Sequence, residues 1–147
     1  MDDTFHYEND TLRYDNFCIN RHIETMCKNT RNFRDYKVWQ DAVDYSEKIY
    51  SITADLPYFE KKGLCDQLRR AVVSISSNVA EGSAQPSDVH FAHFLDMALG
   101  SAYEVETQLI ISKKLNYLSE EVFCELLNEV QSIEKQLSAF IRRVRKI

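Results

Sequence analysis

Apolar residues recur at three- and four-residue steps through four successive segments of the chain. Residues at this spacing share one face of an α-helix, so each segment predicts an amphipathic helix. We expect these helices over residues 35–56, 64–81, 87–115 and 119–145. The 147 residues include only three glycines and two prolines, which favours long helices over a turn-rich sheet. The sequence therefore predicts an all-α protein.

Helix start and stop signals lie between the four segments. Asp35, Ser87 and Ser119 are of residue types that cap helix N-termini. Gly63 and Gly82 flank the second segment and predict its two ends. Connections of a few residues favour antiparallel neighbours, so we expect an antiparallel up-down-up-down four-helix bundle over residues 33–147.

The first part of the chain, residues 1–32, lacks a sustained period of two or of three to four. Residues 1–30 carry six acidic and three basic side chains. Such a segment buries little apolar surface, so we predict an acidic N-terminal extension that is irregular or disordered.

Charge and cysteine content limit the class of protein. The formal net charge of -5 argues against a chain that coats nucleic acid or an anionic membrane over its whole surface. No apolar run is long enough to span a membrane. The cysteines form no CxxC pair and follow no signal peptide, so we expect reduced thiols and a cytoplasmic protein. They are Cys18, Cys27, Cys65 and Cys124.

A polar stripe runs beside the apolar ladder of the second helix. Successive residues 100° apart place five polar side chains on one arc: Gln67, Arg70, Ser74, Asn78 and Glu81. The third helix offers small and polar groups near the core edge, where a short side chain allows close approach of the helices: Gly100, Ser101, Glu104 and Gln108. We expect Arg70 to pair with Glu104 or Glu81 and to hold helices or subunits together, since a partly buried cation needs a carboxylate. Direct ligand binding is the alternative role for Arg70.

The neighbouring Arg69 falls on the far flank of the same helix. There it is freer to meet solvent, a neighbouring subunit or a phosphate. We therefore take Arg69 as a candidate nucleic-acid contact.

Several apolar residues lie off the main stripes, namely Tyr45, Tyr50, Tyr103, Ile110 and Ile111. A second apolar face predicts a partner surface, and self-association is the simplest use of it. The alternative is a monomer with scattered surface aromatics.

The chain ends in IRRVRKI, which supplies four more candidate nucleic-acid contacts: Arg142, Arg143, Arg145 and Lys146. In an oligomer this basic end is repeated, which makes sequence-nonspecific phosphate binding plausible for an acidic chain. Alternatively, these cations only complement the negative end of the helix dipole.

The sequence predicts no enzyme, cofactor or metal. A di-iron helical bundle needs Glu-x-x-His pairs, and none occurs. Nucleophile and phosphate-loop motifs do not occur either. His90 and His93 are three residues apart without a paired carboxylate cluster, and Cys18, His22 and Cys27 are irregularly spaced.

Three stretches together resemble a known family. They are FRDYKVWQ at 33–40, GLCDQLRRAVVSISSNVAEG at 63–82 and FLDMALGSAYEVETQL at 94–109. In this order and spacing they resemble the four-helix bundle proteins that are also called the 23S rRNA intervening sequence protein family. The resemblance excludes the first 30 residues and departs at Val72 and Ser76. The positions that match the family's signature have no assigned catalytic role: Trp39, Gln67, Leu68, Arg69, Arg70, Ser74, Asn78, Glu81, Gly82, Gly100, Ser101, Glu104 and Glu106.

The resemblance implies a cytoplasmic bacterial protein that assembles as a homopentamer and has no established enzymatic activity. It is also similar to the accessory proteins of diversity-generating retroelements. We therefore expect a noncatalytic scaffold or adaptor that binds itself, structured RNA or DNA, or a nucleic-acid enzyme such as a reverse transcriptase. A module that binds protein alone is the alternative.

Overall fold

Four α-helices make up most of residues 31–147, the part of the chain that the computed structural model describes. They are α2 (Lys37–Ala54), α3 (Leu64–Ser83), α4 (Asp88–Lys114) and α5 (Glu120–Arg145). Two 3-10 turns precede α2 and α3: η1 (Phe33–Asp35) and η2 (Tyr58–Glu60). No strand occurs in the described part, which confirms the all-α prediction. The predicted extension over residues 1–32 lies outside the described residues except for its last two positions.

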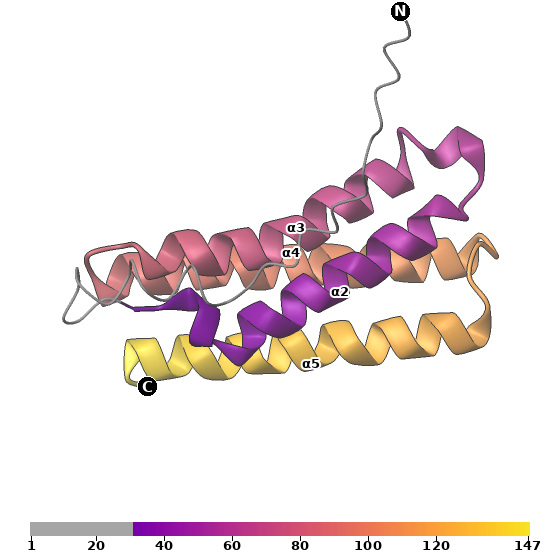
Figure 1. Cartoon of the computed structure of the whole chain (residues 1–147). Coiled ribbons are helices and arrows are strands. Elements are labelled where there is room, and N and C mark those ends of the chain that lie inside the picture. The colour runs from indigo at the N-terminus through magenta and orange to yellow at the C-terminus, as the bar shows by residue number, and fades with distance from the viewer. Residues whose placement is uncertain (1–30) are drawn as a thin grey trace, which may run out of the picture. The chain divides into compact units, whose positions relative to one another are not determined.

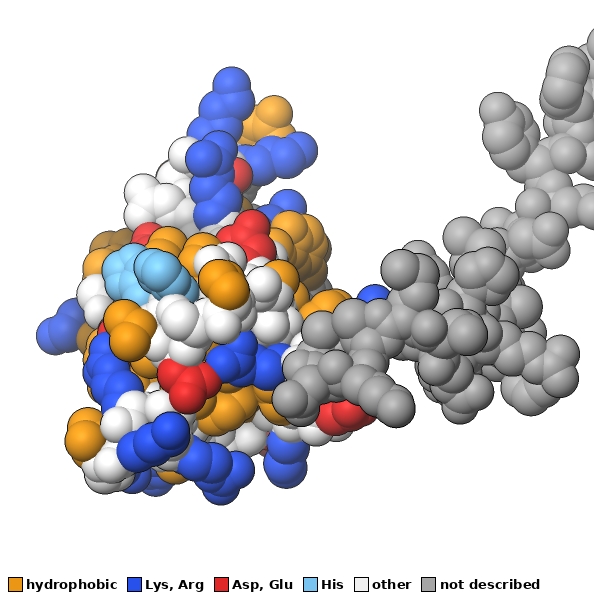
Figure 2. Space-filling view, turned by 90° about the vertical axis from the view of Figure 1, so that its left-hand side faces the viewer, with side chains coloured by type: hydrophobic (Ala, Val, Ile, Leu, Met, Phe, Trp, Pro, Cys, Tyr) orange, Lys and Arg blue, Asp and Glu red, His pale blue; other side chains and the backbone are white. Residues whose placement is uncertain are grey.

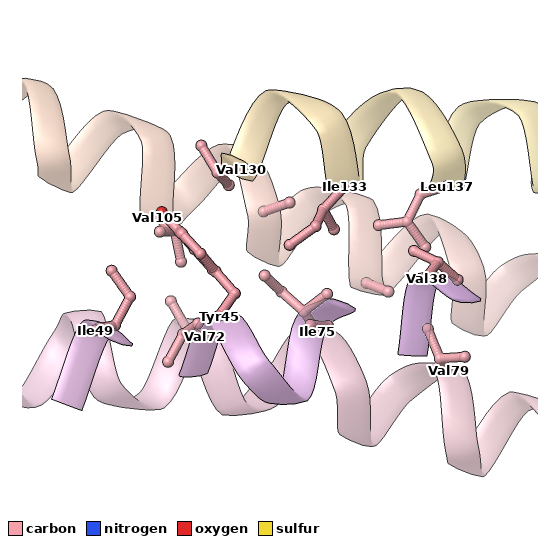
Figure 3. Packing of buried hydrophobic residues seen from close by; sticks show 14 of the residues in the cluster. Val38, Tyr45, Ile49, Val72, Ile75, Val79, Val105, Val130, Ile133 and Leu137 are labelled. Carbon is pink, nitrogen blue, oxygen red and sulfur yellow. The ribbon is translucent and has the colours of Figure 1, made fainter. Parts of the chain in front are cut away.

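The four helices pack around one apolar core, an arrangement consistent with a helical bundle (Figure 1). Within this unit α3 contacts α2 and α4, and α5 contacts α4 and α2. The ladder of α3 faces inward as its period predicts, and Leu68, Ile75 and Val79 are each 0% exposed. Burial of one such side chain contributes about 1.5–3 kcal/mol to folding. Figure 3 shows side chains from all four helices meeting in this core.

The prediction for one aromatic residue of the core is wrong. Tyr45, predicted to be part of a partner surface, is 1% exposed. Its hydroxyl donates a hydrogen bond to the Leu126 carbonyl oxygen of α5 at 2.9 Å. A buried tyrosine needs such a partner for its hydroxyl, and the neighbouring helix supplies it.

The caps of α4 and α5 are the predicted serines. The hydroxyl oxygens of Ser87 and Ser119 each accept a hydrogen bond from the backbone amide three residues later. The predicted cap of α2 is wrong, because Asp35 lies in η1 and Tyr36 occupies the N-cap position without a side-chain bond. The Asp35 carboxylate instead accepts a 2.9 Å hydrogen bond from the Asn32 amide, which holds it in the preceding turn.

Two glycines differ from their predicted roles. Gly82 does not follow α3 but lies inside it, and the helix ends at Ser83. A Cβ at Gly82 would lie 2.7 Å from the Phe94 Cβ, so the missing side chain allows α3 and α4 to approach closely. Gly100, expected at a close helix contact, has no atom within 4 Å of an added Cβ. The close contact thus lies at Gly82 and not at Gly100.

Candidate interaction surfaces

Part of the predicted polar stripe lies at the contact between α3 and α4. The hydroxyl oxygens of Ser74 and Ser101 are 2.9 Å apart. The Asn78 amide donates to the Ser74 carbonyl oxygen at 2.8 Å and is itself buried. The Gln108 amide nitrogen lies 3.3 Å from the Gln67 amide oxygen. Gln67 and Ser74 thus contact α4, whereas Asn78 bonds within α3 to Ser74.

The predicted partner of Arg70 is wrong. The Arg70 side chain is 80% exposed, and its Nε lies 3.1 Å from the carboxylate of Asp66, one turn earlier in α3. Glu104 instead accepts a 3.1 Å hydrogen bond from Gln108 within α4. Glu81, the other predicted partner, is exposed. Arg70 therefore lies on the outer face of α3 and is not part of the contact with α4.

Arg69, which the helical angle placed toward solvent, is the more constrained of the two arginines. Its Nε donates a 2.8 Å hydrogen bond to the hydroxyl of buried Thr53 in α2. Its guanidinium carbon lies 4.9 Å from the Tyr50 ring centroid, within the range of a cation–π contact. The terminal N–H groups of Arg69 can still contact a ligand, because Thr53 engages only Nε.

A groove of about 730 Å³ runs along the outer face of α3. Its lining mixes apolar and charged side chains, including Tyr50, Arg70, Val73, Glu81 and Met97. We call it the α3 groove. The outer members of the predicted stripe, Arg70 and Glu81, face solvent in this groove and not the core.

Apolar side chains remain exposed around this groove and along α4. Those that are 38–50% exposed include Tyr50, Met97, Tyr103, Ile110 and Ile111. Of the predicted partner-surface residues, four of the five are thus accessible and Tyr45 is not. An apolar face of this kind is a feature of protein interfaces.

The basic C-terminal end of α5 is exposed, and one of its four cations forms an ion pair within the described residues. Arg145 pairs with the Asp96 carboxylate of α4. Arg142, Arg143 and Lys146 are exposed and form no ion pair with a carboxylate of residues 31–147. Their main chain closes the helix, because the amides of Lys146 and Ile147 donate to the carbonyl oxygens of Arg143 and Arg142. In Figure 2, Lys and Arg side chains gather over the lower part of this end of the unit, where Figure 1 places the C-terminus.

A buried carboxyl group was missed by the sequence reasoning. Glu134 of α5 is 9% exposed, and its Oε1 has no hydrogen-bond partner among the described residues. Burial and the nearby Glu106 carboxylate raise the pKa of Glu134 to about 7. Glu106 accepts a 2.8 Å hydrogen bond from the Gln131 amide. The signal in the sequence is weak: Glu134 directly follows the ladder residue Ile133, where a glutamate is ordinarily exposed.

The two described cysteines have the environment of neutral thiols. Burial raises the pKa of the Cys65 thiol, which lies 3.4 Å from the Thr53 carbonyl oxygen. Desolvation by the surrounding protein and the adjacent Glu120 carboxylate raise the pKa of the exposed Cys124 thiol. A raised pKa lowers the fraction of thiolate, which is the reactive form.

No group of three or more side chains suited to hold a metal ion occurs within residues 31–147. His90 bonds to the Ser87 hydroxyl at 2.9 Å, and His93 is exposed. Cys18, His22 and Cys27 lie outside the described residues. Among the helices of the described part, none has the length and apolarity to cross a membrane.

Comparison with known proteins identifies the family. A solved structure of an S23 ribosomal protein family member from Bacteroides thetaiotaomicron, a protein with unknown function, is similar with a TM-score of 0.67 and 25% sequence identity. The match covers 71% of this chain and 98% of that chain. No protein with a curated description matches. Residues 34–139 match the model of the 23S rRNA-intervening sequence protein, and the chain belongs to that family.

Proposed function

We propose that the protein is a noncatalytic, homo-oligomeric scaffold that binds the phosphate backbone of structured RNA or DNA through the basic end of α5. The observation that carries the proposal is the exposure of Arg142, Arg143 and Lys146 without a described carboxylate partner. Exposed cations gathered at one end can replace the counterions of a phosphate backbone. Repeated copies of this end in an oligomer add to the contact.

Self-association is the second part of the proposal. The exposed apolar side chains of α4 and the α3 groove supply a surface that a second copy of the chain can cover. The short connections and the contacts between successive helices favour an up-down-up-down bundle. With the homopentamer that the family resemblance implies, the basic end occurs five times in one assembly, and its phosphate contacts act together.

The proposal places the scaffold in the bacterial cytoplasm, with RNA, DNA or a nucleic-acid enzyme such as a reverse transcriptase as partner. Its noncatalytic character is supported by the chemistry of the described side chains. Both described thiols have a raised pKa. The arginines of α3 are engaged in contacts within the chain.

Charge reversal tests the phosphate contact. Arg142→Glu and Arg143→Glu each replace a cation at the basic end, and we expect each to weaken binding of a labelled RNA hairpin about tenfold at fixed salt. Lys135→Glu is the matched control, because it makes the same change at an exposed position in the middle of α5. Fluorescence anisotropy of the full chain gives the affinities. Equal affinity of all three variants and the unchanged protein would contradict the proposal.

A module that binds protein alone is the second candidate function. The mixed apolar and charged lining of the α3 groove favours it, since protein interfaces combine an apolar centre with a polar rim. In this case the protein binds neither RNA nor DNA, and charge reversal at Arg142 or Arg143 does not change the anisotropy of the labelled RNA. The anisotropy experiment therefore separates the two candidates.

A further inference from the structure

Two consecutive aromatic residues lie exposed at the end of the unit that is opposite the C-terminus. They are Tyr58 and Phe59 of η2, which are 84% and 75% exposed. Tyr58 is the most exposed large hydrophobic residue within residues 31–147. Figure 1 shows the connection between α2 and α3 at the far end from the C-terminus. Aromatic rings contribute stability by burial, so folding alone does not account for this pair.

Contacts with neighbouring segments fix the position of η2. The Phe59 ring meets the Tyr117 ring edge to face, with the centroids 6.4 Å apart. The Tyr117 hydroxyl donates to one carboxylate oxygen of Glu60 at 3.1 Å. The other Glu60 oxygen accepts from the Leu64 amide at 3.2 Å. The connection is therefore tied to the start of α3 and to the segment between α4 and α5, so the exposed rings need little ordering on binding.

Two lysines directly follow the aromatic pair. The Lys61 ammonium lies 5.6 Å from the Tyr58 ring centroid. Lys61 and Lys62 are exposed, and neither forms an ion pair with a carboxylate of the described residues. We call these four residues, Tyr58, Phe59, Lys61 and Lys62, the η2 tip. Glu60 lies between them, but its two oxygens already accept the hydrogen bonds from Tyr117 and Leu64.

We propose that the η2 tip binds single-stranded nucleic acid, with Tyr58 and Phe59 stacked on unpaired bases and Lys61 and Lys62 on the adjoining phosphates. This inference rests on the proposed function and adds a second contact at the opposite end of the unit. Proteins that bind single strands combine aromatic stacking faces with cations along the backbone. A continuous duplex keeps its bases stacked on each other, so the tip discriminates against it.

A membrane surface is the other partner that exposed aromatic and lysine side chains fit. The η2 tip is less suited to it, because insertion of the two rings would draw the adjacent Glu60 carboxylate into an apolar layer, and such burial of a charge is unfavourable. Stacking on a base leaves that carboxylate in water. The geometry therefore favours nucleic acid.

The test measures the affinity of the full chain for a labelled 20-nucleotide oligo-dT strand and for a hairpin duplex. Tyr58→Ala and Phe59→Ala are expected to weaken single-strand binding about tenfold and to leave duplex binding unchanged. Tyr58→Leu and Phe59→Leu keep an apolar side chain without an aromatic face, and we expect them to weaken binding as the alanine variants do. Val89→Ala is the control, because Val89 is an exposed apolar residue outside the tip, 78% exposed.

Three results would overturn the inference. The first is single-strand affinity that is equal in the tip variants and the unchanged protein; duplex binding that persists then leaves the proposed function intact. The second is full affinity in the leucine variants, which excludes stacking. The third concerns vesicles of phosphatidylcholine and phosphatidylserine. If the tip variants lose vesicle binding that the unchanged protein shows, and still bind the single strand with full affinity, the tip is a membrane contact. Absence of binding to any nucleic acid contradicts the proposed function as well.

Discussion

At the scale of single residues, the two adjacent arginines of α3 show how neighbouring helices decide a side chain's role. Helical angles separate Arg69 from Arg70 correctly, but they do not tell which flank α2 covers. The Thr53 hydroxyl and the Tyr50 ring of α2 lie on the Arg69 side, whereas Arg70 meets only Asp66 of its own helix. Arg69 is consequently the structural arginine of the pair.

Substitution of the two arginines should therefore affect stability unequally. We expect Arg69→Ala to lower the free energy of unfolding by about 1–2 kcal/mol, because it removes a hydrogen bond to a buried hydroxyl and a cation–π contact. Arg70→Ala should lower it by less than about 0.5 kcal/mol, as is usual for an exposed ion pair. Urea unfolding at one protein concentration measures both. An equal or larger loss at Arg70 would contradict this assignment.

Glu134 gives a prediction of pH dependence. Its pKa in the folded chain, about 7, lies above the ordinary value of 4.5, so between these values the folded chain binds more protons than the unfolded chain. The contribution of Glu134 to the free energy of unfolding is fully present below about pH 4.5 and is lost as the pH rises through 7. The charged groups around it are Glu106 of α4 and Lys135 of α5, and Tyr45 of α2 also faces it.

Glu134→Gln removes the ionisable group and keeps its shape. We expect the variant to be more stable than the unchanged protein at pH 8, by up to about 3 kcal/mol, and this difference to shrink toward pH 5. Thermal unfolding at a series of pH values gives the comparison, and Glu121→Gln, at an exposed position of the same helix, serves as control. A difference that does not change with pH would exclude the raised pKa.

At the scale of the helices, hydrophobic periodicity was sufficient to predict their number and order, because each helix buries one face. The residues that begin and end each helix were less predictable. Asp35 has the residue type of a cap, yet Asn32 holds it in η1. Gly82 has the residue type of a terminator, yet the approach of α4 requires a glycine inside α3. These outcomes depend on contacts with other segments, which a single segment's pattern does not contain.

The two helical glycines test the α3–α4 contact directly. Gly82→Ala should lower the free energy of unfolding by about 1–3 kcal/mol, because the added methyl group meets the Phe94 Cβ at 2.7 Å. Gly100→Ala meets nothing within 4 Å and should stabilise the helix by about 0.5–1 kcal/mol. Chemical unfolding measures whether each substitution raises or lowers the free energy of unfolding. A gain in stability at Gly82 would show that the helices have room there.

The candidate site was less predictable from the sequence than the helices. The contact of Ser74 with Ser101 follows from helical angles, since both lie beside an apolar ladder. The burial of Tyr45 and the exposure of Arg70 do not, because they depend on which neighbour covers each flank. The η2 tip has no periodic pattern at all, and its exposure is evident only once the connection is placed relative to Tyr117.

At the scale of the whole molecule, the exposed apolar face predicts assembly. We expect light scattering to give a mass near five times the 17.2 kDa of one chain. Ile111→Asp, which places a charge on the apolar face of α4, should lower this mass, whereas Asn128→Asp at an exposed position of α5 should not. A stable monomer at micromolar concentration would contradict the assembly.

The salt dependence of nucleic-acid binding tests the central claim most directly. The claim is that repeated basic ends of α5 hold a phosphate backbone, so binding releases condensed counterions. We expect the logarithm of the association constant of the full chain for an RNA hairpin to fall linearly with the logarithm of the salt concentration, by about 0.7–0.9 per phosphate contact. The slope should become shallower in Arg142→Glu. An affinity that stays constant as the salt concentration rises would contradict the account.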